Sequence, residues 1–349
     1  MTSINRQSKI SYSFLLLLFS FSLLFASCSI NNSENDQTEP TLTIEVAPTT
    51  TPSPQPTSTP EPETIAVVTS SELKQDVVDN IKMSVEEVAQ SNALVVQYFD
   101  NSESLISVPN LKIAVLLTMP NDLDGLLNNL PNTNFIVYSE WDIQSRNNLN
   151  IIRIHPEYRT FMAGYLIELI ATDRRAAAIL PNDTVFGTAL EDSLKNGGHY
   201  YCGICQTYYA PYVSFPLATS LPTTTDLTTW LSYVDEMLKN YVYVMYVSPK
   251  ISSPDLYYEL ARRGLILAGG ETPPDEILPY WAATIDHDLI SPLDEILPNI
   301  ISGQTGIILD APLTLSDINV DLFSIGKQNL YKETYDILQE GLIYPYNPF

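Results

Sequence analysis

The sequence holds few residues in the arrangements that catalysis requires. It has three histidines, His155, His199 and His287, and none belongs to a His-Glu-x-x-His zinc motif. It also lacks a Gly-x-Ser-x-Gly nucleophile elbow and a phosphate-binding glycine loop. A Ser/His/Asp set can be picked from any chain of this size, so its presence does not indicate a hydrolase. We therefore expect a non-enzymatic protein with no cofactor and no catalytic metal.

Two of the three cysteines form the sequence Cys-Gly-Ile-Cys, at Cys202 and Cys205. In an oxidising compartment such a pair is read first as a disulfide. Free thiols and a metal or redox role are the alternatives. A metal would need further ligands, for which His199 and nearby carboxylates are the candidates. A redox pair favours a helix N-terminus, whereas the tyrosines around this pair predict a strand over 200–208.

The third cysteine, Cys28, follows a segment with the order of a secretory signal peptide. Arg6 and Lys9 precede an almost purely apolar run over 15–25, and small residues follow it. The run is shorter than the roughly 20 residues that a membrane-spanning helix needs. The residues before Cys28 resemble the lipobox of bacterial lipoproteins, which implies cleavage after residue 27 and acylation of Cys28, for example with palmitate. An ordinary cleaved signal with an unmodified cysteine is the alternative.

Composition limits which partners the protein is expected to bind and where it is expected to be located. The formal net charge of −24 opposes binding to phosphate backbones, so we expect no nucleic-acid partner. Residues 28–63 are rich in Thr, Pro, Ser and Asn, most densely over 49–62, and contain no Lys or Arg. Such a segment cannot bury a core and is expected to act as an extended, disordered tether. We therefore expect a membrane-anchored protein on the extracytoplasmic side.

From Thr64 onward, apolar strand patterns alternate with amphipathic helix patterns. Alternation of this kind is typical of parallel sheets covered on both faces, so the expected fold class is α/β. Two such series predict two doubly wound lobes joined by a hinge: 64–155 with 286–325, and 156–285 with 326–349. The expected strands are 64–68, 93–96, 112–117, 134–138, 150–154, 176–180, 200–208, 241–247, 265–267 and 281–285. The expected helices are 72–90, 122–129, 156–171, 185–196, 226–240, 254–263, 288–302 and 327–340.

Four short motifs in this region resemble a known family. They are Pro156–Tyr165, Ala177–Pro181 followed by Phe186-Gly187, Thr284–Asp288, and Gly341–Ile343. Their order and spacing are similar to those of type I periplasmic binding proteins, and more narrowly to the basic membrane protein family of lipoproteins. The resemblance implies a solute bound between two lobes and delivery to an ABC-type importer.

The first lobe departs from that family at one point. After the first strand the family often carries Asp and Phe-Asn, where the purine nucleoside of its best-known members binds. This chain has Thr69-Ser-Ser-Glu-Leu73 there. The resemblance therefore implies a small polar solute, nucleoside-like or of another kind.

Candidate ligand-binding residues lie after the strands, because ligands of open parallel sheets bind at the carboxyl ends of strands. They are Ser70, Thr118, Trp141, Asn182, Phe186, Ser248, Glu271 and Asp286.

Several of these positions, and their neighbours, also have plain structural interpretations. Ser71, Asp183, Thr184 and Asp288 fit helix caps, and Trp141 fits packing at the hinge. Gly269-Gly270 permits close approach of a ligand or simply a turn.

Together these observations predict a lipid-anchored solute-binding protein whose partners are a small solute, the membrane and an ABC permease. The alternative from another class is a surface sensor or interaction lipoprotein that retains the fold without transport. A hydrolase is a third hypothesis, and it requires activity that depends on a specific Ser, Asp or His.

Overall fold

The computed structural model describes residues 61–70 and 73–346. These residues belong to one compact unit, which spans residues 59–349. The predicted signal peptide, Cys28 and most of the tether lie outside the described residues, as do Ser71 and Glu72. Among the described helices, none combines the length and the apolar character needed to cross a membrane.

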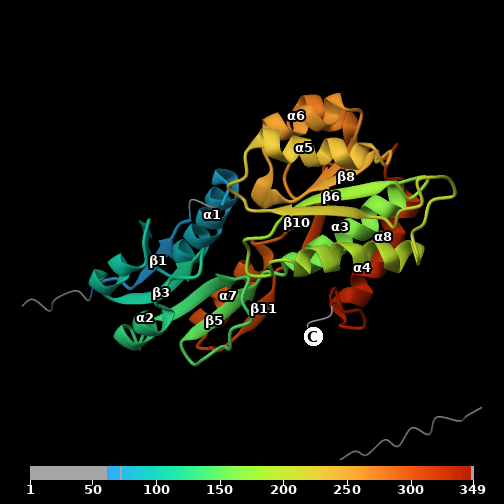
Figure 1. Cartoon of the computed structure of the whole chain (residues 1–349). Coiled ribbons are helices and arrows are strands. Elements are labelled where there is room, and N and C mark those ends of the chain that lie inside the picture. The colour runs from blue at the N-terminus through green and yellow to red at the C-terminus, as the bar shows by residue number, and fades with distance from the viewer. Residues whose placement is uncertain (1–60, 71–72, 347–349) are drawn as a thin grey trace, which may run out of the picture. The chain divides into compact units, whose positions relative to one another are not determined.

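The first lobe is built on a six-stranded sheet whose neighbouring strands all run parallel (Figure 1). The strand order is β11-β5-β4-β3-β1-β2. The strands are β1 (Thr64–Val68), β2 (Val95–Phe99), β3 (Leu111–Leu116), β4 (Asn134–Ser139), β5 (Leu149–Arg153) and β11 (Ile308–Asp310). The helices of this lobe are α1 (Gln75–Ser91), α2 (Leu123–Asn129), α7 (Ser291–Ile301) and the 3₁₀ turn η1 (Glu103–Ser107).

Both faces of this sheet are covered, as the continuous apolar run of β1 predicts. Ile65 and Val67 pack with the apolar faces of α1 and α7 in one core cluster. Ala66 and Val68 point to the other face and pack with residues of α2 and η1. Because successive side chains of a strand alternate between faces, one five-residue run serves two cores.

The second lobe contains a six-stranded sheet in the order β12-β10-β9-β8-β6-β7. The strands are β6 (Ala176–Pro181), β7 (Leu217–Leu221), β8 (Val244–Val247), β9 (Ile266–Gly269), β10 (Trp281–His287) and β12 (Leu313–Ser316). All neighbours run parallel except β12, which pairs antiparallel with β10 at the edge of the sheet.

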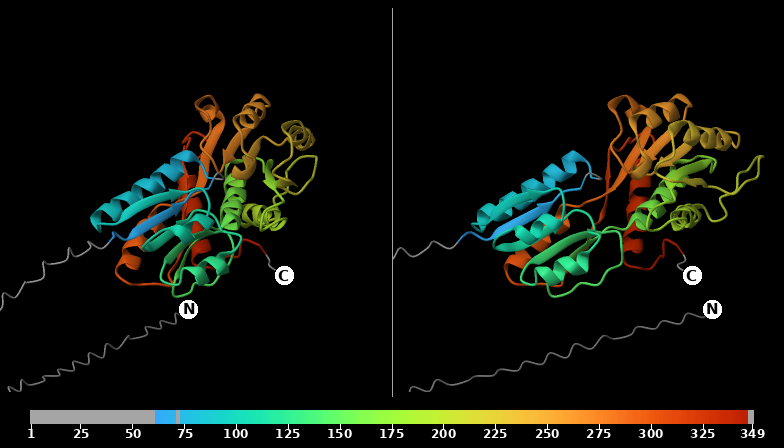
Figure 2. Two further views of the ribbon diagram at one scale, coloured as in Figure 1. Left: turned by 90° about the vertical axis from the view of Figure 1, so that its left-hand side faces the viewer. Right: turned by 60° about the vertical axis from the view of Figure 1, so that its left-hand side comes forward.

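Helices cover both faces of the second sheet as well (Figures 1 and 2). One face packs against α3 (Pro156–Ile170), α4 (Ala189–Cys202) and α8 (Ile325–Gln339). The other packs against α5 (Leu227–Leu238) and α6 (Pro254–Arg262). The short turns η2 (Pro249–Ile251) and η3 (Asp275–Tyr280) follow β8 and β9. Helix α3 is buried along almost its whole length, so it is the central helix of this lobe.

The chain passes between the two sheets three times. The passages run from β5 to α3, from β10 to α7, and from β11 to β12. The third passage differs from the prediction, which assigned residues 286–325 to the first lobe. Strand β12 lies in the second sheet, and Phe323 packs in the core beside α3. The sequence did not reveal this because β11 and β12 are too short, at three and four residues, to show a strand pattern.

The strand predicted over 200–208 is wrong. Helix α4 continues through Tyr200 and Tyr201 to Cys202, and Gly203, at φ 71°, ends it. The two tyrosine rings lie 6.3 and 5.4 Å from the ring of Tyr165 in α3. Packing between the two helices thus outweighs the strand preference of aromatic residues, which depends strongly on context.

Candidate functional site

Three adjoining hollows lie between loops of the two sheets, and we call them together the cleft. All three are lined by Glu140 and Ile154, and the two larger have volumes of about 700 and 710 Å³. Their walls include segments that follow β1, β3, β4 and β5 of one sheet and β6, β7, β8, β9 and β10 of the other. The cleft is therefore at the carboxyl ends of the parallel strands and is large enough for a small solute.

Six of the eight candidate residues line this cleft. They are Ser70, Thr118, Trp141, Phe186, Glu271 and Asp286. Five of them lie in five different loops, and Asp286 lies near the end of β10.

Asn182 and Ser248 do not line any of the three hollows. The Asn182 amide donates to the backbone oxygen of Ser220 at 3.1 Å, so it ties its loop to β7. Ser248 is only 6% exposed, and its backbone N–H donates to the oxygen of Ile179 at 3.2 Å. Both residues follow strands as predicted, but the Asn182 side chain binds the local backbone and Ser248 is buried.

Trp141 stands at the junction of the two larger hollows. Its side chain is 56% exposed, although its backbone is held firmly. The Ser139 hydroxyl donates to the Trp141 oxygen at 3.0 Å, and the Trp141 N–H donates back to that hydroxyl at 2.9 Å. A fixed backbone and an open indole suit a stacking surface better than hinge packing.

Two ion pairs connect the lobes across the cleft. The Lys250 ammonium, after β8, donates to the Glu140 carboxylate, after β4, at 3.0 Å. Lys74, before α1, lies 3.7 Å from the carboxylate of Glu271, after β9. All four side chains are partly exposed, so each pair is worth at most about 1 kcal/mol. Pairs of this strength join the lobes but cost little to separate.

A buried polar cluster lies where the chain crosses between lobes. The Arg159 guanidinium of α3 donates to the Asp286 carboxylate at 3.2 Å. The imidazole of His287 lies beside it, with Nδ1 3.4 Å from Arg159 Nη1 and Nε2 3.2 Å from the backbone oxygen of His155. Burial and the charge of Arg159 lower the pKa of His287 well below its ordinary value, so this ring is neutral.

The second histidine of this cluster is in the opposite state. His155 Nδ1 lies 2.8 Å from Glu157, Nε2 lies 3.2 Å from Asp310, and the ring stacks on Tyr158 at 4.5 Å. Burial lowers the pKa of His155, but the hydrogen bonds to Asp310 and Glu157 outweigh it and raise the pKa to about 9. His155 is therefore protonated at neutral pH and joins segments of both lobes.

Aromatic residues form one wall of the cleft. Tyr158 and Phe186 are joined there by Tyr344 and Tyr346 from the C-terminal segment. The ring centroids of Phe186 and Tyr346 lie 6.3 Å apart, and the amide of Asn196 donates to the Pro345 oxygen at 3.1 Å. The C-terminal segment thus contributes to the cleft, which the sequence gave no reason to expect.

Two residues predicted as caps have different outcomes. Asp288 accepts hydrogen bonds from the backbone N–H groups of Ile290 and Ser291 at 2.9 and 3.0 Å, and so binds the chain where α7 begins, although Ile290 occupies the N-cap position. Asp183 lines the cleft and accepts two hydrogen bonds from Thr223, while α4 begins only at Ala189. Asp183 therefore braces two cleft loops and does not cap the helix.

Lys74, Glu140, Lys250 and Arg159 were not among the predicted site residues. Glu140 carried a usable signal, since it follows a predicted strand directly. The two lysines sit at helix or turn starts, where charged residues are common, and Arg159 lies inside a helix pattern. Their roles follow from the approach of the two lobes, which local sequence does not encode.

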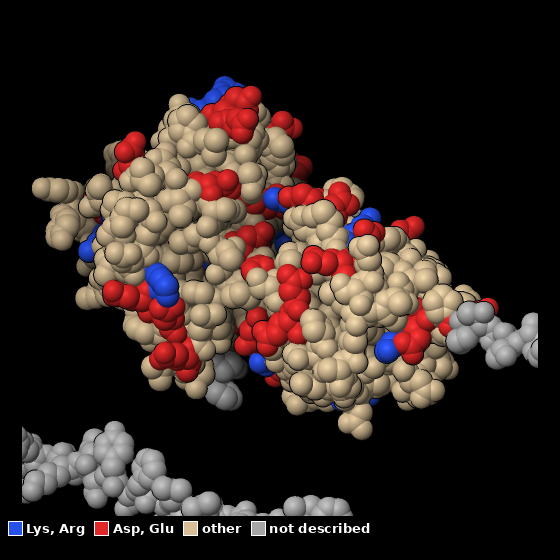
Figure 3. Space-filling view, turned by 180° about the vertical axis from the view of Figure 1, so that it is seen from behind, with Lys and Arg blue, Asp and Glu red and all other residues tan. Residues whose placement is uncertain are grey.

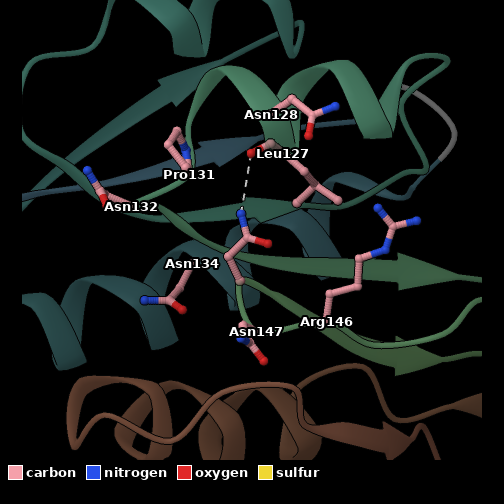
Figure 4. Close-up of a pocket in the computed structure, with 8 residues that line it drawn as sticks. Leu127, Asn128, Pro131, Asn132, Asn134, Arg146 and Asn147 are labelled. Carbon is pink, nitrogen blue, oxygen red and sulfur yellow. Dashed lines mark hydrogen bonds between the residues drawn. The ribbon is translucent and has the colours of Figure 1, made fainter.

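A further hollow lies in the first lobe, away from these loops (Figure 4). It is lined by Asn134 at the amino end of β4 and by residues around the end of α2. Arg146, the charged residue in this wall, is already paired with Asp124 at 2.7 Å. Its position at the amino end of the sheet makes it a poor candidate for the ligand site.

Solved structures of similar fold cover both lobes of this chain. An ABC transporter solute-binding protein from Conexibacter woesei matches with a TM-score of 0.60 and 13% identity, covering 81% of this chain and 98% of that one. A second such protein, from Aeropyrum pernix, matches with a TM-score of 0.57 and 14% identity, covering 81% and 93%. A transcriptional activator of the comK gene from Bacillus halodurans matches with a TM-score of 0.56 and 10% identity, covering 82% and 100%.

No protein-family model matches the sequence. No curated protein matches it either. The structural matches nevertheless extend over both lobes, and the chain has the type I periplasmic binding protein fold. The predicted fold class, two doubly wound parallel-sheet lobes joined by a hinge, is confirmed.

Proposed function

We propose that this protein is a lipid-anchored solute-binding protein that works outside the cytoplasmic membrane and delivers a small polar solute to an ABC-type importer. The observation that carries the proposal is the cleft, which collects loops from the carboxyl ends of both sheets. Two lobes connected by crossing segments can close around a solute, and a permease can recognise the closed form. The C. woesei and A. pernix proteins of the same fold are described as ABC transporter solute-binding proteins.

The charges of the cleft favour an uncharged or cationic solute over an anionic one. Each Lys or Arg that lines the hollows has an acidic partner: Lys74, Lys250, Arg153 and Arg159 pair with Glu271, Glu140, Asp310 and Asp286. An anion would have to break one of these pairs. The exposed face of Trp141 offers stacking to a ring or a cation–π contact to a cation. Acidic side chains also outnumber basic ones on the face of the molecule in Figure 3.

A thermal-shift screen of the purified protein with nucleosides, sugars, amino acids and polyamines tests this proposal. A solute at about a hundredfold excess over its dissociation constant should stabilise the fold by about 2.7 kcal/mol. Intrinsic fluorescence provides a second readout, because Trp230 and Trp281 are buried and Trp141 is exposed in the cleft. Trp141→Ala should remove the fluorescence change and weaken the thermal shift.

Tyr212→Ala is the matched control, since Tyr212 is 69% exposed and lines none of the three hollows. It should leave both readouts unchanged. If no compound in the screen stabilises the protein, the solute-binding proposal fails. A surface sensor or interaction lipoprotein would then be the better hypothesis.

The membrane anchor is tested separately through Cys28. Cells that express the wild-type chain should incorporate radioactive palmitate into this protein, and Cys28→Ala should abolish labelling and release the protein from the membrane fraction. Cys202→Ala serves as the control for loss of a cysteine. Unchanged labelling of Cys28→Ala would refute the anchor and leave the solute-binding proposal standing.

A further inference from the structure

Glu168 is a buried carboxylate that the cleft does not use. It lies in the last turn of α3 and is 0% exposed. Neither of its two oxygens has a hydrogen-bond partner among the described residues. A buried carboxylate without a partner is costly, and most buried polar groups in proteins are paired. The packing of α3 and α4 thus buries a carboxyl group that receives no hydrogen bond from the described residues.

The groups that face Glu168 are the sulfurs of Cys202 and Cys205. A Glu168 oxygen and the two Sγ atoms all lie within 4.8 Å of one another. The two cysteines are joined by a disulfide. Cys202 is the last residue of α4 and is half-buried, and Cys205, after the turn at Gly203, is 2% exposed. The cluster therefore has a closed inner side and one side that reagents can approach.

The electrostatic surroundings favour a cation over a free thiolate. Cys202 lies at the C-terminus of α4, where the backbone carbonyls carry partial negative charge. Its Sγ is 3.1 Å from the oxygen of Gly198. These oxygens and the carboxylate oppose an isolated thiolate, so the pair differs from reactive cysteines at helix N-termini. Arg174 is near enough to act on Glu168 electrostatically, and it offsets part of the negative charge.

We propose that Cys202, Cys205 and Glu168 form a binding site for Zn²⁺ when the disulfide is reduced. Two thiolates and one carboxylate match the borderline-soft character of Zn²⁺, and the hard carboxylate favours it over Cu⁺. Zn²⁺ bonds sulfur at about 2.3 Å and carboxylate oxygen at about 2.0–2.2 Å, so tetrahedral ligands lie about 3.5–4 Å apart. The Glu168 oxygen already lies within 4.8 Å of both sulfurs, and reduction of the disulfide lets the two bonded sulfurs move apart to the distance that the ion requires. Three protein ligands leave a fourth position for water or another ligand.

The chemistry of this switch balances with a dithiol as the reductant. The dithiol transfers two electrons and two protons to the Cys202–Cys205 disulfide and becomes a disulfide itself. Zn²⁺ then replaces the two thiol protons and the carboxyl proton of Glu168, which all pass to water, and bonds the two sulfurs and the carboxylate. Exchange with a disulfide oxidant reverses the process: the oxidant takes two electrons from the two thiolates, leaves as a dithiol with two protons from water, and the ion is released. The site is remote from the cleft, and the proposal is independent of solute binding.

Cobalt binding to the full-length protein tests the site, because Co²⁺ takes Zn²⁺ sites and bonded thiolates give it a charge-transfer absorption. The protein is reduced without oxygen, freed of reductant and titrated with Co²⁺, and Zn²⁺ is then added as a competitor. Reduced wild-type protein should bind one Co²⁺ with the thiolate and tetrahedral bands, and Zn²⁺ should displace it. Oxidised protein should show no thiolate band. Alkylation by iodoacetamide before and after reduction confirms the starting oxidation state.

Glu168→Gln distinguishes the proposed site from an ordinary pair of cysteines. It should weaken Zn²⁺ binding at least about tenfold, because mutating even a residue that only hydrogen-bonds to a metal ligand lowers metal affinity by about 10–100-fold. Asp192→Asn removes the same charge from an exposed position of α4 and should change nothing. If Glu168→Gln does not fold, X-ray absorption of Zn²⁺-loaded wild-type protein identifies the zinc ligands instead. We expect two sulfurs and at least one oxygen around the ion. No charge-transfer band in reduced protein, an unchanged affinity in Glu168→Gln, or a zinc shell without two sulfurs would overturn the proposal.

Discussion

Helix α3 carries buried ionisable side chains at both of its ends, and the two ends differ in how these groups are paired. At the N-terminal end, Arg159 bonds Asp286, and Glu157 bonds His155. At the C-terminal end, Glu168 is fully buried, and neither oxygen has a hydrogen-bond partner among the described residues. Both ends belong to one helix, so the difference arises from the elements packed against each end.

The two ends of α3 contribute differently to the structure. Pairing at the N-terminal end joins α3 to β10 and to the crossing segments, so those charges position the cleft. The unpaired carboxylate at the C-terminal end positions nothing in the oxidised protein and costs stability. Between the two ends, Gly164 of α3 packs so closely on α4 that an added Cβ would lie 2.0 Å from the oxygen of Leu194.

Replacing Gly197 of α4 should have the largest effect, because it tests the contact that separates the two ends. A Cβ at this position would lie 1.8 Å from the backbone oxygen of Phe161, which a side-chain rotation cannot relieve. We expect Gly197→Ala to lower the free energy of unfolding by about 3 kcal/mol or more. Urea denaturation followed by circular dichroism measures the loss. Gly326→Ala is the control, since nothing lies within 4 Å of its added Cβ. A loss in Gly197→Ala no larger than in this control would contradict the close helix packing.

Replacing Glu168 should have the next largest effect, with a definite dependence on pH. In the oxidised, metal-free protein, burial raises the pKa of Glu168 from 4.5 to about 8. The folded state therefore holds a proton that the unfolded chain releases, and stability falls as pH rises from about 4.5 to 8. We expect the free energy of unfolding of Glu168→Gln, measured relative to that of wild type, to rise by about 2–4 kcal/mol between pH 5 and pH 9. Urea denaturation of both proteins at each pH measures the gain. A difference that does not change with pH would show that Glu168 has a partner.

Arg159→Ala tests the paired end of α3 and should be destabilising. Its guanidinium side chain is 10% exposed, but that of Asp286 is 44% exposed, so the carboxylate left behind is partly hydrated. We expect a loss of about 2 kcal/mol in the free energy of unfolding, below the 3–5 kcal/mol typical of fully buried pairs. Arg262→Ala provides the comparison, because this arginine is 74% exposed in its pair with Glu259. Equal effects of the two substitutions would remove the distinction between the buried and the surface pair.

The smallest effect is expected for the pair that crosses the cleft. Lys250→Met, Glu140→Gln and the double variant form a cycle that isolates the energy of this interaction. Because both side chains are partly exposed, we expect a coupling below about 1 kcal/mol that decreases with added salt. Chemical denaturation at low and high ionic strength measures it. A coupling energy above that limit would show that the Lys250–Glu140 pair behaves like the Arg159–Asp286 pair and not like a surface pair.

The sequence predicted the parts of this fold that depend on local pattern. The apolar run of 64–68 is β1, the predicted helix over 72–90 overlaps α1 except at its last residue, and Asp288 binds the amides of Ile290 and Ser291 where α7 begins. Five of the candidate ligand-binding residues lie in loops that line the cleft, and Asp286 lines it from β10. The strand and helix predictions match the structure because strand alternation and helical period are properties of short segments, whereas ligand binding by these residues stays a prediction.

Other features were beyond local pattern. Residues 200–208 have the composition of a strand, yet the first of them continue α4 because their rings pack on Tyr165. Strand β12 is only four residues long, and its place in the second sheet depends on pairing with β10. The polar partners of Asn182 and the burial of Ser248 likewise depend on neighbouring strands.

The sequence by itself thus determined most of the succession of strands and helices, and with it the α/β class and the edge of each sheet that lines the cleft. Only the tertiary structure decided which charges are paired. Arg159 meets Asp286 across 127 residues of sequence, and Lys250 meets Glu140 across 110. Glu168 lies against two sulfurs more than 30 positions away. Periodicity fixes the face on which a side chain lies, whereas an electrostatic partner is chosen by the distance between elements, which exists only after they pack.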